Sequence, residues 1–224
     1  MSTSLELRAN EVQVWIASLV VSGARFDDLA RTVSPEERQR ADNLAPAASR
    51  RFVVARGILR SLLSGFTGAP PRLLQFNYGR AGKPSLADHD IHFNISHSAD
   101  LGLFAFASDR AVGVDVENER PVRRLLDVAQ RFMPEGEVRA LAATPQEERD
   151  ARFLRLWVVR EARLKAEGKG IWSGTENKNS SADLTHKLFA PRPAYIAAIA
   201  ASGADWRLYT CAMTDGDTGS AGRG

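Results

Sequence analysis

The sequence contains a single cysteine, Cys211, among its 224 residues. One cysteine cannot form an internal disulfide or a cysteine-based zinc cluster, and such scarcity is typical of a reducing compartment. Long apolar runs are also lacking, because the stretch Val14–Val21 is interrupted by Ser18 and is far shorter than the roughly 20 residues that span a bilayer. Glu6 and Glu11 lie where a signal peptide would carry positive charge. We therefore expect a cytoplasmic protein without membrane association.

A strong excess of either charge is absent as well. The chain has 30 basic and 27 acidic residues, a formal net charge of +3 and a pI near 9.3. This mild excess does not by itself require nucleic acid, although clustered arginines would suit an anionic ligand. Hydrophobic residues make up 44% and charged residues 25%, which excludes a disordered, collagenous or coiled-coil chain. The length allows one large domain or two small ones.

The periodicity of the apolar residues predicts an α+β fold. Ser34-Pro35-Glu36-Glu37 is a strong helix start, with serine as N-cap and Glu37 completing a capping box. Further helices are expected over 47–63, 122–132, 135–143 and 146–167, and strands over 12–20, 74–78, 92–97, 101–107, 111–117, 194–201 and 205–212. The pairs 101–107 with 111–117 and 194–201 with 205–212 are interpreted as hairpins. The segment 173–186 is interpreted as a polar loop, and residues 214–224 as a disordered tail.

The segment Val112–Glu117 combines three valines with two carboxylates. In a strand the valines would face the core, whereas Gly113, Asp115 and Glu117 would share the other face. Glycine would leave open space beside the two acids, which repel each other unless a cation or a proton lies between them. Taken alone, the pattern is more typical of a solvent-facing strand with two ordinary acids.

A second carboxylate pattern lies in the expected helix 146–167. Helical spacing puts Glu161 beside the apolar stripe of Phe153, Trp157 and Leu164, where a carboxylate is costly unless it is paired or binds a metal. The simpler interpretation is a surface pair with Lys165. Together, however, the strand acids and Glu161 make three hard oxygen ligands, which favour Mg²⁺ over zinc.

Two groups of polar residues could contact an anion. In the first, His92, Asn94 and Ser96 share one strand face, His97 follows at the strand end and Lys83 lies in a preceding Gly-Lys-Pro turn. The second group consists of arginines in the expected helices, namely Arg38, Arg40, Arg50, Arg51, Arg56 and Arg60. Helix N-termini favour anions, so arginines there suit phosphate. For each group a purely structural or solvated role is the alternative.

Five segments in order resemble the 4′-phosphopantetheinyl transferases of the surfactin-synthetase-activating type. They are Gly82-Lys83-Pro84, Phe93–Ser98, Gly113–Glu117, Phe132-x4-Glu137, and Trp157–Gly170 with its Arg160-Glu161-Ala162-x2-Lys165 core. Enzymes of this family move the phosphopantetheine arm of coenzyme A onto a serine of an acyl or peptidyl carrier protein. Two departures are Arg160, where many members have lysine, and Glu37, where some have a phosphate-binding lysine.

The resemblance implies a role for each matching residue. Asp115, Glu117 and Glu161 are similar to the family's magnesium ligands. The residues similar to those that bind coenzyme A are Arg40, Arg51, Lys83, Ser96, His97 and Lys165. Glu161 is the candidate to take the serine proton, Glu137 is its alternative, and Lys165 would stabilise charge on the reacting phosphate. The carrier protein is expected to dock around residues 123–133.

The resemblance also implies a pseudo-dimer of two similar α+β halves with the active site in the cleft between them. The halves would be residues 1–110 and 111–213, and one chain would act as a monomer. Two functions of other classes stay open. The arginine-rich helices could bind nucleic acid or an acidic partner without magnesium, or the acids could serve a magnesium-dependent phosphohydrolase that uses water as its nucleophile.

Overall fold

The structure is a computed structural model that describes residues 5–79, 82–169 and 183–214. The helices are α1 (Gly23–Thr32), α2 (Pro35–Asp42), α3 (Pro46–Thr67), the short 3₁₀ helix η1 (Pro71–Leu73), α4 (Leu125–Phe132), α5 (Glu135–Ala142) and α6 (Gln146–Ala166). The strands are β1 (Glu11–Ser18), β2 (Phe76–Tyr78), β3 (Pro84–Leu86), β4 (His92–Ser98), β5 (Leu101–Ala107), β6 (Val112–Asn118), β7 (Leu184–Phe189), β8 (Tyr195–Ser202) and β9 (Arg207–Ala212). The expected α+β class is confirmed.

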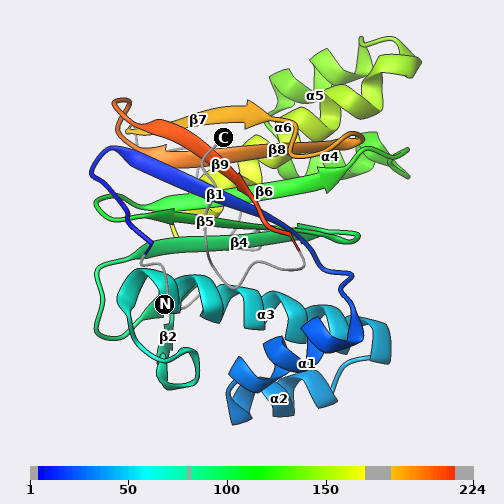
Figure 1. The fold of residues 1–224 in the computed structure, drawn as a ribbon. Helices are drawn as coiled ribbons and strands as arrows, with labels where there is room; N and C mark the ends of the chain where they lie inside the picture. The colour runs from blue at the N-terminus through cyan, green and yellow to red at the C-terminus, as the bar shows by residue number, and fades with distance from the viewer. Residues whose placement is uncertain (1–4, 80–81, 170–182, 215–224) are drawn as a thin grey trace.

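The strands form two larger sheets that lie between two groups of helices (Figure 1). One sheet has the order β4-β5-β1-β9, the other has the order β6-β8-β7, and β2 pairs with β3 in a small hairpin. Alternating side chains of the two larger sheets meet in a shared core that includes Val14, Leu103, Val114 and Ile199. Helix α3 covers the outer face of the first sheet, and α6 covers the outer face of the second.

The helices around the first sheet begin and end where local signals place them. Ser34 accepts a hydrogen bond from the Glu37 amide, and the Glu37 carboxylate accepts one from the Ser34 amide, so the predicted capping box is confirmed. Helix α3 continues past the expected stop at Gly65 and ends at Gly68, whose φ of +73° belongs to the left-handed region. Helix α1 was not anticipated from the sequence pattern.

Both predicted hairpins are wrong. β5 pairs with β4 and β1, while β6 pairs with β8 in the other sheet. β9 does not pair with β8 but runs parallel to β1. The strands were placed correctly, but each is apolar on its core face. The apolar faces of two such strands are buried whether the strands are neighbours in one sheet or lie in two sheets that face each other across the core. Alternation alone therefore does not distinguish the two arrangements.

The second of the two halves expected from the resemblance therefore contributes a strand to the first. β9 comes from the second half and completes the sheet of the first half. The polar loop expected over 173–186 ends earlier, because β7 begins at Leu184; residues 173–182 lie outside the described part of the chain. The expected tail also lies outside it, apart from Thr214. In the described ranges no helix is long and apolar enough to cross a bilayer.

Candidate functional site

The carboxylates of β6 face helix α6. The valines of this strand point into the shared core as predicted, and Asp115 lies on the opposite side with only 5% of its surface exposed. Gly113 does not leave open space there. A Cβ on Gly113 would lie 2.2 Å from the carbonyl oxygen of Ala162 and 2.3 Å from the amide nitrogen of Ala166. Glycine therefore lets α6 approach β6 closely, which brings the helix side chains to the strand acids.

Lys165 of α6 binds the first strand acid. Its Nζ donates to Asp115 Oδ1 at 2.7 Å and to Ser96 Oγ at 3.1 Å, and it lies 3.3 Å from the Val114 carbonyl oxygen. The simple surface pair between Glu161 and Lys165 is not formed, since within the described residues Lys165 pairs with Asp115. The lysine thus links the helix, β6 and β4 at one point.

Two carboxylate oxygens at this point are buried without a hydrogen-bond partner in the described structure, Asp115 Oδ2 and Glu161 Oε1. Burial, with the negative charge of Asp115, raises the pKa of Glu161 to about 7. Burial and the same aspartate also raise the pKa of Glu117. No group of three or more His, Cys, Asp or Glu in the described ranges is arranged to hold a metal ion by itself. The acids form a buried cluster with negative charge that the fold leaves partly uncompensated.

The polar face of β4 binds β6 from the side. The Val114 amide donates to Asn94 Oδ1 at 2.9 Å, Ser96 Oγ donates to Asp115 Oδ1 at 2.9 Å, and Ser98 Oγ donates to Glu117 Oε2 at 3.2 Å. Sequence reasoning placed Asn94 and Ser96 on one strand face as possible anion contacts, but it assigned no role to Ser98 and no contact with β6 to any of the three. Their signal was the period-two alternation along β4, which places all three on one face. These residues join the edges of the two sheets and hold both strand acids.

A cleft of about 630 Å³ opens beside this cluster, between α2 and α3 on one side and α6 on the other. Of the predicted site residues, those that line it are Arg40, Arg51, Lys83, His97, Glu161 and Lys165. Ser96 and Asp115 are buried behind its wall through their contacts with Lys165. The cleft thus brings together residues from both halves of the chain, and most of its charged side chains are cations.

Arg51 is a cation of the cleft that is left for a ligand. Within the described part of the chain it makes no hydrogen bond or ion pair. Arg40 lies 5.3 Å from the ring centre of Phe52. The pKa of His97 is lowered, first by partial burial and then by the nearby charges of Lys165 and Arg51. This face of the cleft is therefore electropositive, a character that suits an anionic ligand.

The arginines of α2 and α3 form a solvated basic face only in part, because Arg38, Arg40, Arg50 and Arg51 are exposed but two others are not. Arg56 and Arg60 are buried, and both donate to the carboxylate of Glu37, Arg60 at a distance of 2.7 Å. Arg56 also donates to Tyr78 Oη at 3.3 Å. Glu37 thus has a structural role that its sequence position did not reveal, since its partners lie 19 and 23 residues further along the chain.

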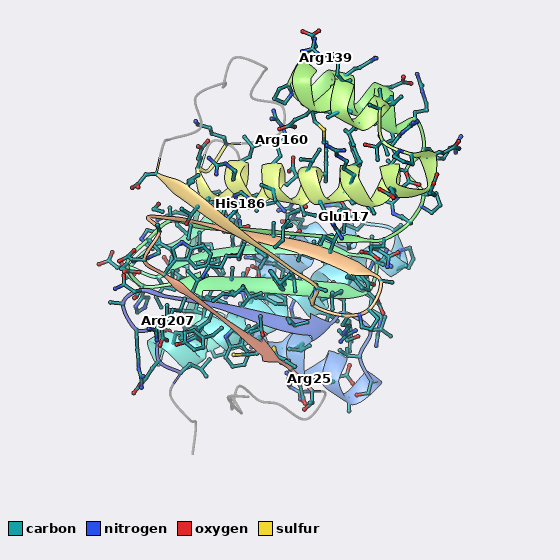
Figure 2. All side chains as sticks on the ribbon, turned by 90° about the horizontal axis from the view of Figure 1, so that it is seen from above. Arg25, Glu117, Arg139, Arg160, His186 and Arg207 are labelled. Atoms are coloured by element: carbon teal, nitrogen blue, oxygen red, sulfur yellow. The ribbon has the colours of Figure 1, made fainter. Side chains whose placement is uncertain are left out.

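Glu137 is not brought to the cleft. It lies in α5, which packs on α4 and α6, and it is not among the lining residues. Figure 2 shows α5, marked by Arg139, on the side of α6 that faces away from the strands, whereas Glu117 lies at the strand side. The role of Glu137 as an alternative proton acceptor stays a prediction.

Comparison with known proteins identifies the family. The 4′-phosphopantetheinyl transferase HetI of Nostoc sp. is 39% identical over 173 residues, which cover 75% of this chain and 73% of HetI. Residues 111–210 match the 4′-phosphopantetheinyl transferase superfamily. The chain belongs to the 4′-phosphopantetheinyl transferase superfamily. The resemblance seen in the sequence motifs is thereby confirmed, as is the expectation of an enzyme of this class.

Two further relatives of this superfamily show how much of the chain is shared. The transferase gsp of Aneurinibacillus migulanus is 30% identical over 178 residues, or 76% of this chain and 73% of gsp. The transferase Sfp of Bacillus subtilis is 32% identical over 141 residues, or 62% of each chain. The match with Sfp therefore spans less than two thirds of that phosphopantetheinyl transferase.

Proposed function

We propose that this chain transfers the 4′-phosphopantetheine arm of coenzyme A to a serine of an apo carrier protein and releases 3′,5′-ADP. One observation carries the proposal: a cation-lined cleft ends at a buried cluster of carboxylates with unpartnered oxygens. Coenzyme A carries a 3′-phosphate at its nucleotide end and a pyrophosphate between the nucleotide and the pantetheine arm, and this order of charges fits the cleft. Both halves of the single chain line the cleft, which supports action as a monomer.

The carboxylates fit a magnesium ion. Asp115 and Glu161 each bury an oxygen that has no partner among the described residues, and burial together with the repulsion from Asp115 raises the pKa of Glu161. A hard divalent cation would give the two buried oxygens a partner and would also neutralise the repulsion between the two carboxylates. We propose that Asp115, Glu117 and Glu161 hold Mg²⁺ together with oxygens of the coenzyme A pyrophosphate, since the protein side chains alone do not complete a site.

The reaction would join the serine Oγ to the β-phosphorus and break the bond from that phosphorus to the bridging oxygen, which leaves with 3′,5′-ADP. Bound Mg²⁺ would neutralise the pyrophosphate and polarise its phosphorus. Lys165 would stabilise charge on the phosphate oxygens, and His97, which lines the same cleft, would donate a hydrogen bond to them through a ring N–H. Glu161 is proposed to take the serine proton.

Binding of the remote end of coenzyme A is assigned to the first half. Arg51 is charged, lines the cleft and makes no ion pair in the described structure, so it is free to contact the 3′-phosphate. Arg40 lines the same wall. An arginine can bind a phosphate with two parallel hydrogen bonds, which gives orientation as well as affinity.

Carrier docking is proposed on α4 and the residues before it. Arg123, Arg124 and Arg131 are exposed there, next to the half-buried apolar Leu126. A basic surface around apolar side chains suits an acidic helical partner. Chemical-shift mapping on the labelled protein with an unlabelled carrier should show contacts on residues 123–133, and contacts on residues 5–30 instead would contradict the docking site.

The experiment that tests the transferase function is incubation of the protein with apo carrier, coenzyme A and Mg²⁺. The carrier should gain the mass of one phosphopantetheine arm, while Asp115→Asn and Glu161→Gln should abolish the gain without unfolding the chain. Glu119→Gln is the matched control, because Glu119 is exposed and follows directly after β6.

Two other outcomes would reject this function. Release of phosphate or 3′,5′-ADP without any gain on the carrier would indicate a phosphohydrolase. Magnesium-independent binding of nucleic acid that weakens steeply with salt would indicate a binding module. The second outcome is disfavoured by the burial of Arg56 and Arg60 against Glu37, because that removes two of the cations such a module would present.

A further inference from the structure

Lys83 crosses from one half of the molecule to the other. It precedes β3 in the first half, and its Nζ donates to the carbonyl oxygens of Lys165 at 2.7 Å and Val112 at 2.9 Å, with that of Ala166 at 3.3 Å. An ammonium group carries three hydrogens. These three carbonyls therefore account for all of its donors, although the stem of the side chain lines the cleft.

Two of the three carbonyls that Lys83 binds, those of Lys165 and Ala166, belong to the end of a helix. The last four carbonyl groups of an α-helix lack partners within the helix, and the negative end of the helix dipole favours a cation. α6 ends at Ala166, and Gly168 then takes a left-handed conformation with a φ of +68°. The lysine stem passes there, with Cδ 4.0 Å from where a Cβ on Gly168 would lie. A cation from a distant loop thus acts as the C-terminal cap of α6.

The capped turn carries the charged side chains of the site. Lys165 is held at both ends, because its carbonyl oxygen accepts from Lys83 while its own Nζ donates to Asp115. Glu161 lies one turn earlier on the same helix. The third carbonyl, that of Val112, begins the strand that carries Asp115. One ammonium therefore ties together the backbones of the two elements whose carboxylates must converge.

We propose that Lys83 is a positioning residue, whose ammonium fixes the last turn of α6 against β6 so that Lys165 and Glu161 face Asp115. The inference rests on the proposed transferase function for its kinetic part. It differs from a role in gripping the nucleotide end of coenzyme A, because a lysine with all three hydrogens bound to backbone carbonyls has none left for a phosphate. Burial lowers the pKa of Lys83 to about 8, which agrees with a group turned away from solvent.

The first test is independent of activity. Lys83→Met keeps the length of the stem and removes the donors. Amide hydrogen exchange in residues 165–169 and 112–114 should become at least about tenfold faster than in the wild type, since charge-assisted hydrogen bonds are lost. Lys187→Met is the matched control, because Lys187 also donates to one carbonyl, that of Trp206 at 3.0 Å, but lies on β7. Unchanged exchange at α6 in Lys83→Met would overturn the proposal.

The second test separates positioning from phosphate binding. Lys83→Met should lower kcat about tenfold or more and change the KM for coenzyme A less than threefold, because an ill-placed Lys165 affects the transition state. The loss should be equal with dephospho-coenzyme A, which lacks the 3′-phosphate. Lys83→Arg, which keeps a charged multiple donor, should restore part of kcat.

A raised KM that disappears with dephospho-coenzyme A would instead make Lys83 a phosphate ligand and overturn its positioning role. If the wild-type protein transfers nothing to any carrier, the transferase function fails. The exchange experiment still decides whether Lys83 fixes the end of α6, so the two failures can be told apart.

Discussion

Replacing Glu161 by glutamine should abolish transfer, and its effect on the stability of the metal-free protein should become more favourable from pH 5 to pH 8. Glu161 is 4% exposed, and burial beside Asp115 raises its pKa from 4.5 to about 7. An acid whose pKa is raised in the folded state contributes stability below its unfolded pKa, and that contribution is lost as the pH rises through the folded pKa. Wild-type stability should therefore fall between about pH 4.5 and pH 7.

The expected change in the free energy of unfolding follows from the pKa shift of Glu161. One pKa unit corresponds to about 1.4 kcal/mol, so the full cost of ionising Glu161 in the folded protein is about 3 kcal/mol. Glutamine has the shape of the neutral acid and does not ionise. The difference in unfolding free energy between Glu161→Gln and the wild type should thus grow by about 2–3 kcal/mol from pH 5 to pH 8, whatever the buried amide costs at both pH values.

The assay is urea unfolding in a metal chelator at both pH values. Glu119→Gln, at an exposed carboxylate just after β6, should stay within about 0.5 kcal/mol of the wild type throughout. Adding Mg²⁺ with coenzyme A at about 100 times their dissociation constants should stabilise the wild type by roughly 2.7 kcal/mol and the glutamine variant by clearly less. A stability difference that is the same at pH 5 and pH 8 would refute the argument that Glu161 is a destabilising buried charge.

Three other perturbations test separate parts of the structure. Arg51→Ala should raise the KM for coenzyme A about ten- to hundredfold and leave kcat within a few-fold, because one charge-assisted contact to a non-reacting phosphate is lost. Steady-state kinetics with coenzyme A and dephospho-coenzyme A would measure this. Glu37→Gln should destabilise the fold by about 3–5 kcal/mol, since it removes a charge buried between Arg56 and Arg60. The lowered pKa of Glu37 means that this contribution is present above pH 4.5 and is lost as the pH falls through the folded pKa, which acid unfolding would show. Gly113→Ala should cost about 1–3 kcal/mol or more, because its Cβ would meet backbone atoms of α6, whereas Gly136→Ala, with open space around it, should stabilise α5 by about 0.5–1 kcal/mol.

Each of these has a contrary outcome. Arg51 would be a solvated arginine if its alanine variant lost as much affinity for dephospho-coenzyme A as for coenzyme A. A Glu37→Gln protein as stable as the wild type at pH 7 would mean that the buried ion pairs contribute nothing. Equal thermal stability of the Gly113→Ala and Gly136→Ala proteins would show that α6 moves away from β6 at no cost.

Sequence patterns that act over a few residues determined much of this protein. The capping box at Ser34 located the start of α2, and helical spacing located α4, α5 and α6 within a few residues. Alternation assigned the valines of β6 to the core and its acids to the other face. These predictions succeeded because the relevant forces join residues that are near one another in the chain. The order and spacing of the motifs also identified the family.

Tertiary structure decided which distant residues meet. The pairing of β9 with β1 joins residues almost 200 positions apart, and no local signal distinguishes it from a hairpin with β8. The partners of charged residues were equally hidden. The sequence indicates only a capping role for Glu37, but in the structure its carboxylate also pairs with two buried arginines. For Lys83 the sequence indicates only a lysine in a turn, but in the structure its ammonium binds the end of α6. The sequence around a charged residue does not indicate which residue it will pair with. The pairing depends on burial and on distances between side chains, and both are set only when the sheets and helices pack together.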